Sequence, residues 1–467
     1  MKPKEILAEY FGHRSFRGKQ EEIIGRLLGG GHTLVLMPTG MGKSICFQIP
    51  ALMRPGLTLV ISPLIALMKD QVDGLRAKGI DATFINSSLS RTARERRLDE
   101  LARGKYKLLY VTPERFRKQE FVDLIGTRKI DLLAVDEAHC ISVWGHDFRP
   151  DYTRLEEFRA LIGNPVTVAL TATATPAVQE DIIDQLGLER SNVVLFHEGI
   201  DRPNLCLRVE NVFGEDEKID FIRQQVKRLA GNTIVYLSLI KTLDAYSSRL
   251  TAAGVEHLCY HGKLEKEVRR RVQETFMAGD DALILATNAF GMGVDKDNIR
   301  NVIHAELPGS MEAYYQEIGR AGRDGKTSEC TLLYDERDLL IQMDFIRWNN
   351  PDLSFLHNLY RILDEDNEAA NSFGLDWLKG KLVFKNRTDF RLETALSLFD
   401  RYGVTEGELD RLDLRIVAPL PPELSSERIE TKVQGDLMKL HVMVRYVKEE
   451  GCRKGFIHDY FGIPRQE

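Results

Sequence analysis

Residues 37–44 read Met37-Pro38-Thr39-Gly40-Met41-Gly42-Lys43-Ser44, a glycine-bearing segment that ends in Gly-Lys-Ser. The apolar run 33–36 precedes it and predicts a buried strand, while the run 45–52 after it predicts a helix. Glycines let backbone N–H groups approach an anion, and a helix N-terminus adds partial positive charge. The pattern therefore predicts a phosphate-binding loop, in which Lys43 reaches the outer phosphates and Ser44 binds magnesium. The first glycine of the general pattern is Met37 here, and a glycine-rich turn that binds nothing is the alternative.

Bulk composition narrows the class of protein. The chain has 467 residues, which is too many for one core, so two to four domains are expected. Six scattered cysteines without a close pair favour a reducing compartment over a disulfide framework, and we therefore expect a cytoplasmic protein. No apolar run reaches membrane-spanning length, so no membrane partner is expected. The net charge of −6 requires that any nucleic acid be held by a local groove.

Apolar strands alternate with helical stretches throughout the first 200 residues, which predicts an α/β fold with a parallel sheet. Four more strands are predicted at 57–61, 107–111, 132–135 and 166–170. Each ends in a polar cluster, and the carboxyl ends of parallel strands form the ligand-binding edge of such a sheet.

Asp136 and Glu137 end the third of these strands. After a separate phosphate loop, Asp136 is expected to support magnesium and Glu137 to polarise an attacking water. A strand-end cap is the alternative interpretation.

After Asn204 the alternation begins again, with strands predicted at 233–237, 282–287 and 302–305 and another that ends in the segment 256–262. This second half has no phosphate loop. It does carry Arg320 and Arg323, three residues apart and so on one face of a helical turn. We expect them to reach the nucleotide from the second lobe and to stabilise charge in the transition state, although a surface arginine pair is equally compatible with the pattern.

Together these motifs resemble the RecQ-type DNA helicases of superfamily 2. The resemblance covers residues 8–335 and is most specific in 136–152, which reads DEAHCISVWGHDFRPDY. It implies two RecA-like lobes, ATP as cofactor and 3′–5′ unwinding of DNA. The segment 289–296 resembles the family motif that contacts both DNA and nucleotide. At 238–241 the chain reads Ser-Leu-Ile-Lys where the family usually has Ser-Arg-Lys, which puts one contact in doubt.

The resemblance assigns roles to individual residues. Read alone, Gln20 is a solvent-facing helix residue, whereas the family motif makes it the adenine-reading glutamine. The expected catalytic set is Lys43, Asp136, Glu137, Arg320 and Arg323, and Ser44 with Asp136 is expected to hold Mg²⁺. The expected ATP-binding set is Phe16, Arg17, Gln20, Thr39, Gly40, Met41, Gly42, Lys43, Ser44 and Gln316.

DNA contacts are expected in two kinds of place. Strand-end loops offer backbone and hydroxyl groups suited to phosphates, at Ser62, Pro63, Thr112, Pro113, His261, Thr287 and Asn288. The RecQ-type aromatic loop is expected to stack on bases through Trp144, His146, Phe148 and Arg149. Single-stranded and forked DNA are the expected partners, and the protein is expected to be a monomer.

The C-terminal third departs from the family. The expected domains are lobe 1 at 1–205, lobe 2 at 206–345, a winged-helix-like or plain helical module at 346–430, and the start of a zinc-module hairpin at 431–467. Cys452 resembles the first zinc ligand, but the other cysteines do not follow, so no zinc is expected.

Two other functions fit the same motifs. One is an RNA-dependent ATPase or remodeller, and the other is a nucleotide-gated clamp on DNA junctions with little turnover.

Overall fold

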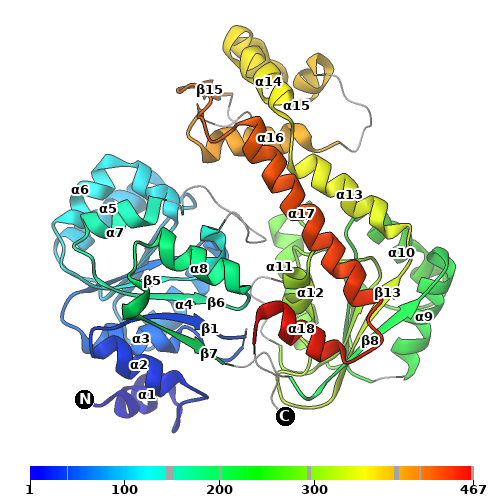
Figure 1. The fold of residues 1–467 in the computed structure, drawn as a ribbon, viewed down its shortest axis with the longest axis horizontal. Coiled ribbons are helices and arrows are strands. Elements are labelled where there is room, and N and C mark those ends of the chain that lie inside the picture. The colour runs from blue at the N-terminus through cyan, green and yellow to red at the C-terminus, as the bar shows by residue number, and fades with distance from the viewer. Residues whose placement is uncertain are drawn as a thin grey trace.

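The computed structural model describes residues 1–38, 40–142, 152, 154–198, 202–228, 230–291, 296–382, 389–407, 409 and 412–463. Figure 1 shows two α/β lobes side by side, with a smaller helical region above them. The predicted fold class, two parallel-sheet lobes and a mostly helical C-terminal region, is confirmed. Within the described ranges, no helix is long and apolar enough to cross a membrane.

Lobe 1 is built on a seven-stranded sheet of order β3-β4-β2-β5-β6-β1-β7 whose pairings are all parallel. Its central strands are buried along their whole length, because helices cover both faces of the sheet. Its strands are β1 (His32–Leu36), β2 (Leu57–Ile61), β3 (Ala82–Ile85), β4 (Leu108–Val111), β5 (Ile130–Val135), β6 (Val166–Thr171) and β7 (Val193–His197). Its helices are α1 (Pro3–Phe11), α2 (Gln20–Leu28), α3 (Ile45–Met53), α4 (Ile65–Ala77), α5 (Arg91–Ala102), η1 (Pro113–Arg117), α6 (Gln119–Gly126), η2 (Ala138–Ile141), α7 (Leu155–Leu161), α8 (Pro176–Gln185) and η4 (Arg190–Asn192).

Lobe 2 has a six-stranded sheet of order β10-β11-β9-β12-β13-β8, and again every pairing is parallel. Its strands are β8 (Leu205–Asn211), β9 (Asn232–Tyr236), β10 (Leu258–Tyr260), β11 (Leu283–Ala286), β12 (Ile299–His304) and β13 (Ser328–Tyr334). Its helices are α9 (Gly214–Arg228), α10 (Ile240–Ala252), α11 (Lys266–Ala278) and α12 (Met311–Ile318).

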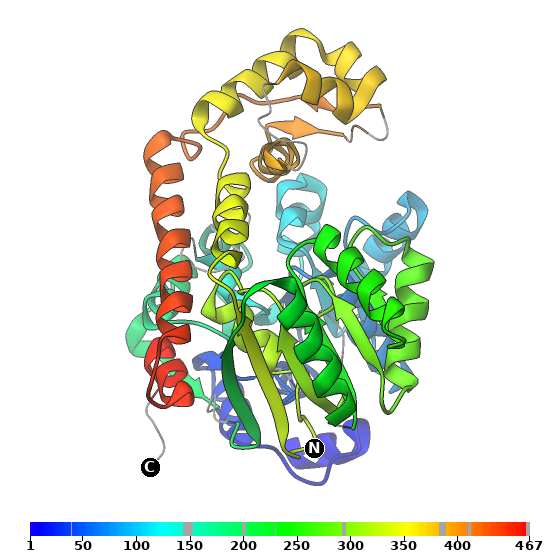
Figure 2. The ribbon, with the colours of Figure 1, turned by 90° about the vertical axis from the view of Figure 1, so that its right-hand side faces the viewer.

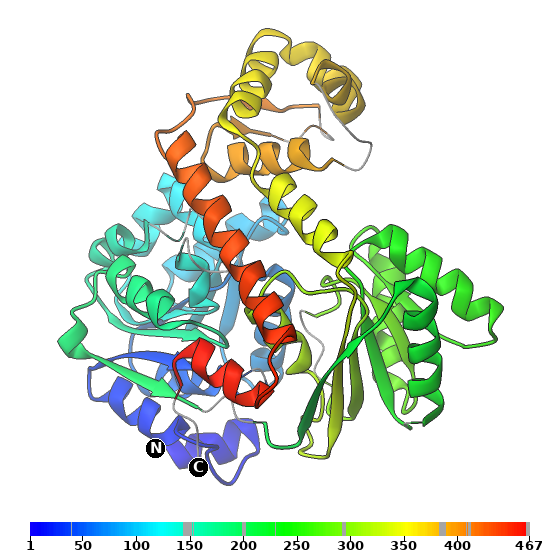
Figure 3. The ribbon, with the colours of Figure 1, turned by 45° about the vertical axis from the view of Figure 1, so that its right-hand side comes forward.

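The C-terminal region begins and ends with helices that pack on lobe 2. Buried residues of α17, including Met443 and Tyr446, share a hydrophobic core with Tyr314 of α12. Figure 2 shows α13 and α17 side by side, leading up to the helical region, and Figure 3 shows α17 and α18 in front of the junction between the lobes. The elements are α13 (Asp338–Asn349), α14 (Leu353–Glu365), α15 (Asn367–Lys381), α16 (Arg391–Arg401), β14 (Thr405–Glu406), β15 (Arg415–Ile416), α17 (Ser426–Val447) and α18 (Arg453–Phe461).

Candidate active site between the lobes

The phosphate loop joins β1 to α3 in a conformation that needs glycine. Gly40 and Gly42 have φ of 87° and 80°, in the left-handed region that L side chains rarely adopt. Lys43 carries a buried Nζ that has no hydrogen-bond partner among the described residues, and its nearest carboxylate oxygen, Glu137 Oε1, is 4.0 Å away. A buried ammonium without a hydrogen bond is costly, so the geometry suits an anion bound against it.

Two carboxylates face this loop from the end of β5. Asp136 is buried, and its oxygens accept hydrogen bonds from the Ser62 hydroxyl at 3.5 Å and from the Glu137 N–H at 3.1 Å. Burial, followed by the neighbouring charge of Glu137, raises the pKa of the Asp136 carboxyl, and the charge of Lys43 opposes that shift. A divalent cation beside this carboxylate would favour its ionised form and so oppose the effect of burial.

Glu137 has φ 48° and ψ 48°, a left-handed conformation that is uncommon for a residue other than glycine. Such conformations cost free energy and cluster at functional sites. The buried Glu137 Oε2 has no hydrogen-bond partner within the described part of the chain, although His139 Nδ1 is 3.4 Å away. The carboxylate is thus held beside Lys43 with an oxygen available to a small ligand such as water.

A polar path leads from Glu137 to lobe 2. His139 Nδ1 lies 3.0 Å from Thr171 Oγ1 at the end of β6, and the same hydroxyl accepts from the Thr173 N–H at 3.2 Å. The Thr173 hydroxyl in turn accepts from Gln316 Nε2 of α12 at 3.4 Å. Gln316, which the sequence placed in the ATP site, therefore contacts lobe 1 beside the catalytic strand ends. His139 lies within the segment 136–152, but the residue patterns of that segment predict no role for it.

Arg323 reaches the phosphate loop from the other lobe. An ideal Cβ on Gly40 would lie 3.3 Å from Arg323 Cδ and 3.4 Å from its Nε, so this side chain rests against the loop backbone. Arg320 is placed differently, because its Nη1 donates to the Gly291 carbonyl within lobe 2. The structure thus brings one of the two predicted arginines to the phosphate loop and holds the other on its own lobe.

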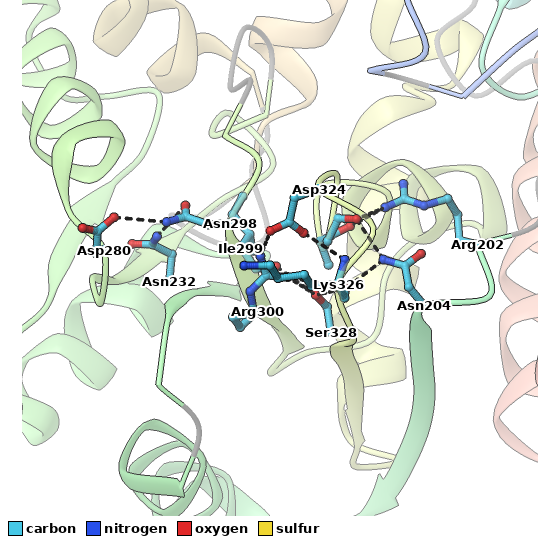
Figure 4. A network of polar contacts seen from close by, with 12 residues as sticks. Arg202, Asn204, Asn232, Asp280, Asn298, Ile299, Arg300, Asp324, Lys326 and Ser328 are labelled. Atoms are coloured by element: carbon cyan, nitrogen blue, oxygen red, sulfur yellow. Dashed lines mark hydrogen bonds and ion pairs between the residues drawn. The ribbon is translucent and has the colours of Figure 1, made fainter. Parts of the chain in front are cut away.

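A hydrogen-bond network holds residues 319–323, which we call the arginine segment because it contains Arg320 and Arg323 (Figure 4). Arg202, in the connection between the lobes, donates to the carbonyls of Ala321 at 2.7 Å, Gly322 at 2.8 Å and Gly319 at 3.3 Å. Asn204 donates to the Gly322 carbonyl at 2.8 Å. These carbonyls flank Arg320 and Arg323, so the connection between the lobes sets the position of the arginines. No motif pointed to Arg202, because its role depends on carbonyls more than 110 residues away in sequence.

The same network continues to β12 and β13. Arg300 forms an ion pair with Asp324 and donates to the Ser328 hydroxyl at 3.0 Å. Asn298, next to β12, links Asn232 and Asp280 at 2.9 and 3.2 Å, as Figure 4 shows. The segment after Arg323 is therefore tied to the sheet of lobe 2.

The N-terminal glutamine contacts the phosphate loop itself. Gln20 is buried, and its Nε2 donates to the carbonyls of Met41 at 2.9 Å and Gly42 at 3.1 Å, while its Oε1 accepts from the Arg17 N–H at 3.0 Å. Arg17 also donates to the Gly40 carbonyl at 3.5 Å. Both residues therefore support the loop, and adenine reading by Gln20 stays a prediction. Phe16 packs on the apolar cluster of α1, α2 and α3.

The predicted DNA contacts lie at strand ends, as expected for a parallel sheet. Ser62, Pro63, Thr112 and Pro113 follow β2 and β4 in lobe 1, and all four are buried, so a phosphate would meet their backbone. In lobe 2, Thr287 is buried, Asn288 is exposed and His261 is half-buried. Further predicted residues lie outside the described ranges: Thr39, Trp144, His146, Phe148, Arg149 and, within the segment 289–296, residues 292–295.

Comparisons with known proteins agree with this geometry. The DEAD/DEAH box helicase model matches residues 17–182, and the helicase conserved C-terminal domain model matches 217–325. Over 463 residues the chain is 36% identical to the probable ATP-dependent DNA helicase RecS of Bacillus subtilis, covering 98% of this chain and 88% of that protein. The chain belongs to the RecQ family of helicases.

This RecQ-family chain is also 49% identical over 342 residues to the ATP-dependent DNA helicase RecQ of B. subtilis, which covers 73% of the chain. It spans 57% of the length of that relative. Among solved structures, S. cerevisiae Dbp5 bound to RNA and ADP BeF3 superposes with a TM-score of 0.59, at 18% identity, over 73% of this chain and 89% of that one. This likeness shows the shared two-lobe fold.

Proposed function

We propose that the protein is an ATP-dependent DNA helicase that moves 3′ to 5′ along single-stranded DNA and separates duplex. The observation that carries the proposal is the contact of Arg323 with the phosphate loop of the opposite lobe. A single bound nucleotide would then be touched by both lobes, so binding and hydrolysis would change how the lobes sit relative to each other. Membership of the RecQ family favours DNA as the track.

The described residues fit ATP with Mg²⁺. The buried Lys43 Nζ suits the outer phosphates, and Gly40 and Gly42 leave room for backbone N–H groups to face them. Ser44 and Asp136 would hold Mg²⁺, which is typically bound by one or two protein side chains plus phosphate oxygens. Bound there, the ion would neutralise charge on the phosphates. Glu137 orients the attacking water, and Arg323, with Arg320 after closure, stabilises charge on the transferred group.

The predicted DNA contacts at strand ends form one set on each lobe, and we call each set a DNA grip. Closing and reopening the lobes around the nucleotide would shift one grip relative to the other. The proposed setting is DNA repair or recombination by a monomer at the bacterial nucleoid. Loop backbones contact phosphates without reading bases, which suits a motor that must act on any sequence.

Steady-state ATPase assays with single-stranded DNA, with RNA and with no nucleic acid test the proposal. Strong stimulation by DNA, together with unwinding of duplexes bearing a 3′ tail but not a 5′ tail, is the expected result. Stimulation by RNA alone would identify an RNA-dependent ATPase instead. Tight binding to forked DNA with negligible turnover would identify a junction clamp.

A further inference from the structure

The region between α13 and α17 has a hydrophobic core of its own. Buried residues from Phe355 to Leu424 form one cluster, which we call the arch module. Helices α13 and α17, which pack on lobe 2, connect the arch module to that lobe. Gln342 of α13 donates to the Leu307 carbonyl at 2.6 Å, and Lys432 of α17 donates to Asn350 Oδ1 at 2.7 Å, so both helices are tied together and to lobe 2.

The arch module also touches lobe 1. Glu406 of β14 forms an ion pair with Lys118 of lobe 1, with 3.6 Å between Oε1 and Nζ. On the other side, the Lys263 ammonium lies 5.8 Å from the centre of the Phe390 ring. Lys118 directly follows η1, which begins at Pro113, and Lys263 is two residues after His261. The arch module therefore contacts each lobe next to a predicted DNA grip.

A cleft of about 1550 Å³ lies beneath the arch module. The strand-end loops of lobe 2 line one wall with Ser238, Asn288 and Ser310, and α16 and α17 line the opposite wall with Arg401 and Lys439. Sites for small molecules rarely exceed roughly 1,000 Å³, so the cleft is large enough for a chain-like ligand.

Carboxylates line the same cleft, among them Glu306, Glu393 and Glu427. Because both signs of charge are present, coulombic attraction would hold a polyanion only weakly here. A strand in this cleft would be retained by enclosure more than by charge.

We propose that the arch module closes a ring over the DNA path and that a single strand of DNA is enclosed beneath it. This inference rests on the proposed function and adds a topological element to it. The ring runs from lobe 1 through the interlobe connection to lobe 2, up α13 and α17 into the arch module, and back to lobe 1 at Lys118. We call the contact between Lys118 and Glu406 the latch, because this ion pair between described residues joins the arch module to lobe 1.

The latch opens easily. The side chains of Lys118 and Glu406 are 62% and 48% exposed, and exposed ion pairs contribute about 0–1 kcal/mol. A DNA strand without a free end therefore enters the ring when the latch opens. A DNA strand with a free end can also thread through the closed ring.

Cross-linking the latch tests the ring directly. Cys452 is exposed and Cys206 and Cys259 are partly exposed, so these three are first replaced by serine. Lys118→Cys with Glu406→Cys is then joined by a bismaleimide. Linked before DNA is added, the protein should load on linear single-stranded DNA and fail to load on a closed single-stranded circle. Linked after loading on the circle, it should stay bound in 1 M salt, where charge contacts are screened within about 3 Å.

The matched control joins Arg361→Cys with Glu365→Cys, an exposed pair 3.2 Å apart within α14. This variant should load on both DNAs and leave the circle in 1 M salt. Equal loading of linear and circular DNA by the pre-linked latch variant overturns the ring. If the pre-linked latch variant loads on neither the linear nor the circular DNA, while the unlinked form binds both, the ring is also overturned. The arch module would then block the DNA path instead of enclosing it. If no form binds any single strand, the proposed function itself fails.

Discussion

The two lobes share one strand order but differ in the segment that follows their first strand, which is β1 in lobe 1 and β8 in lobe 2. The order β3-β4-β2-β5-β6-β1 in lobe 1 corresponds to β10-β11-β9-β12-β13-β8 in lobe 2, and lobe 1 adds β7 at its edge. Strand β1 leads into the phosphate loop, whereas β8 leads through the 83% exposed Phe213 and Gly214 directly into α9. The shared fold therefore carries different chemical groups in the two lobes: lobe 1 has the phosphate loop and the carboxylates, and lobe 2 brings Arg323, which follows α12, against that loop.

Replacing Glu137 of lobe 1 should lower kcat more than any other substitution described below. Glu137→Gln keeps the shape of the side chain but lowers its ability to orient and polarise water, so kcat should fall by roughly 10²–10⁴-fold. The affinity for ATP, measured by equilibrium titration with a fluorescent analogue, should change little. Turnover near the wild-type rate would assign the water-positioning role to another residue.

The equivalent turns of the two lobes offer a paired test. Gly40→Ala places a Cβ 3.3 Å from Arg323 Cδ at a φ of 87°, so it should both strain the loop and displace the arginine. Alanine in the left-handed region costs roughly 1–2 kcal/mol. We expect kcat to fall by about 10–100-fold, given what an arginine finger contributes.

Gly214→Ala is the matched control, because its φ is 84° and the neighbouring group is only the end of the Arg337 side chain. It should lower Tm by about 2–8 °C and leave kcat unchanged. Equal losses of kcat in the two variants would contradict the division of labour between the lobes.

A smaller effect is expected at Arg202, which holds the arginine segment through three carbonyls. Arg202→Ala should lower kcat about tenfold, or roughly 1.4 kcal/mol, without changing the affinity for ADP. If Arg202 acts by positioning Arg320 and Arg323, the change should add nothing in a background that carries both Arg320→Ala and Arg323→Ala. Arg228→Ala, which breaks the ion pair with Glu329 elsewhere on lobe 2, is the control. Additive losses would give Arg202 a merely structural role.

The sequence predicted the buried central strands well, because an apolar run ending in a polar cluster is visible without tertiary context. It missed β8, whose partly exposed residues form no continuous apolar run, and it missed β7 although residues 193–196 of β7 are an apolar run. Both strands lie at the edges of their sheets. It also missed β3 and β13. In the candidate site, the phosphate-loop pattern indicated Lys43, and the Asp-Glu pair at a strand end indicated Glu137. The separate placements of Arg320 and Arg323, and the network behind them, depend on contacts between distant segments that no local pattern records.

We expect one nucleotide to be held between the phosphate loop of lobe 1 and Arg323 of lobe 2. Isothermal titration calorimetry of Arg323→Ala with ADP alone, and with ADP plus a phosphoryl-transfer mimic such as vanadate, tests this arrangement. The affinity for ADP should be nearly unchanged, and the affinity for the mimic should fall by about 10³-fold, as for other arginine fingers. Wild-type affinity for both ligands would show that Arg323 does not contact the transferred group.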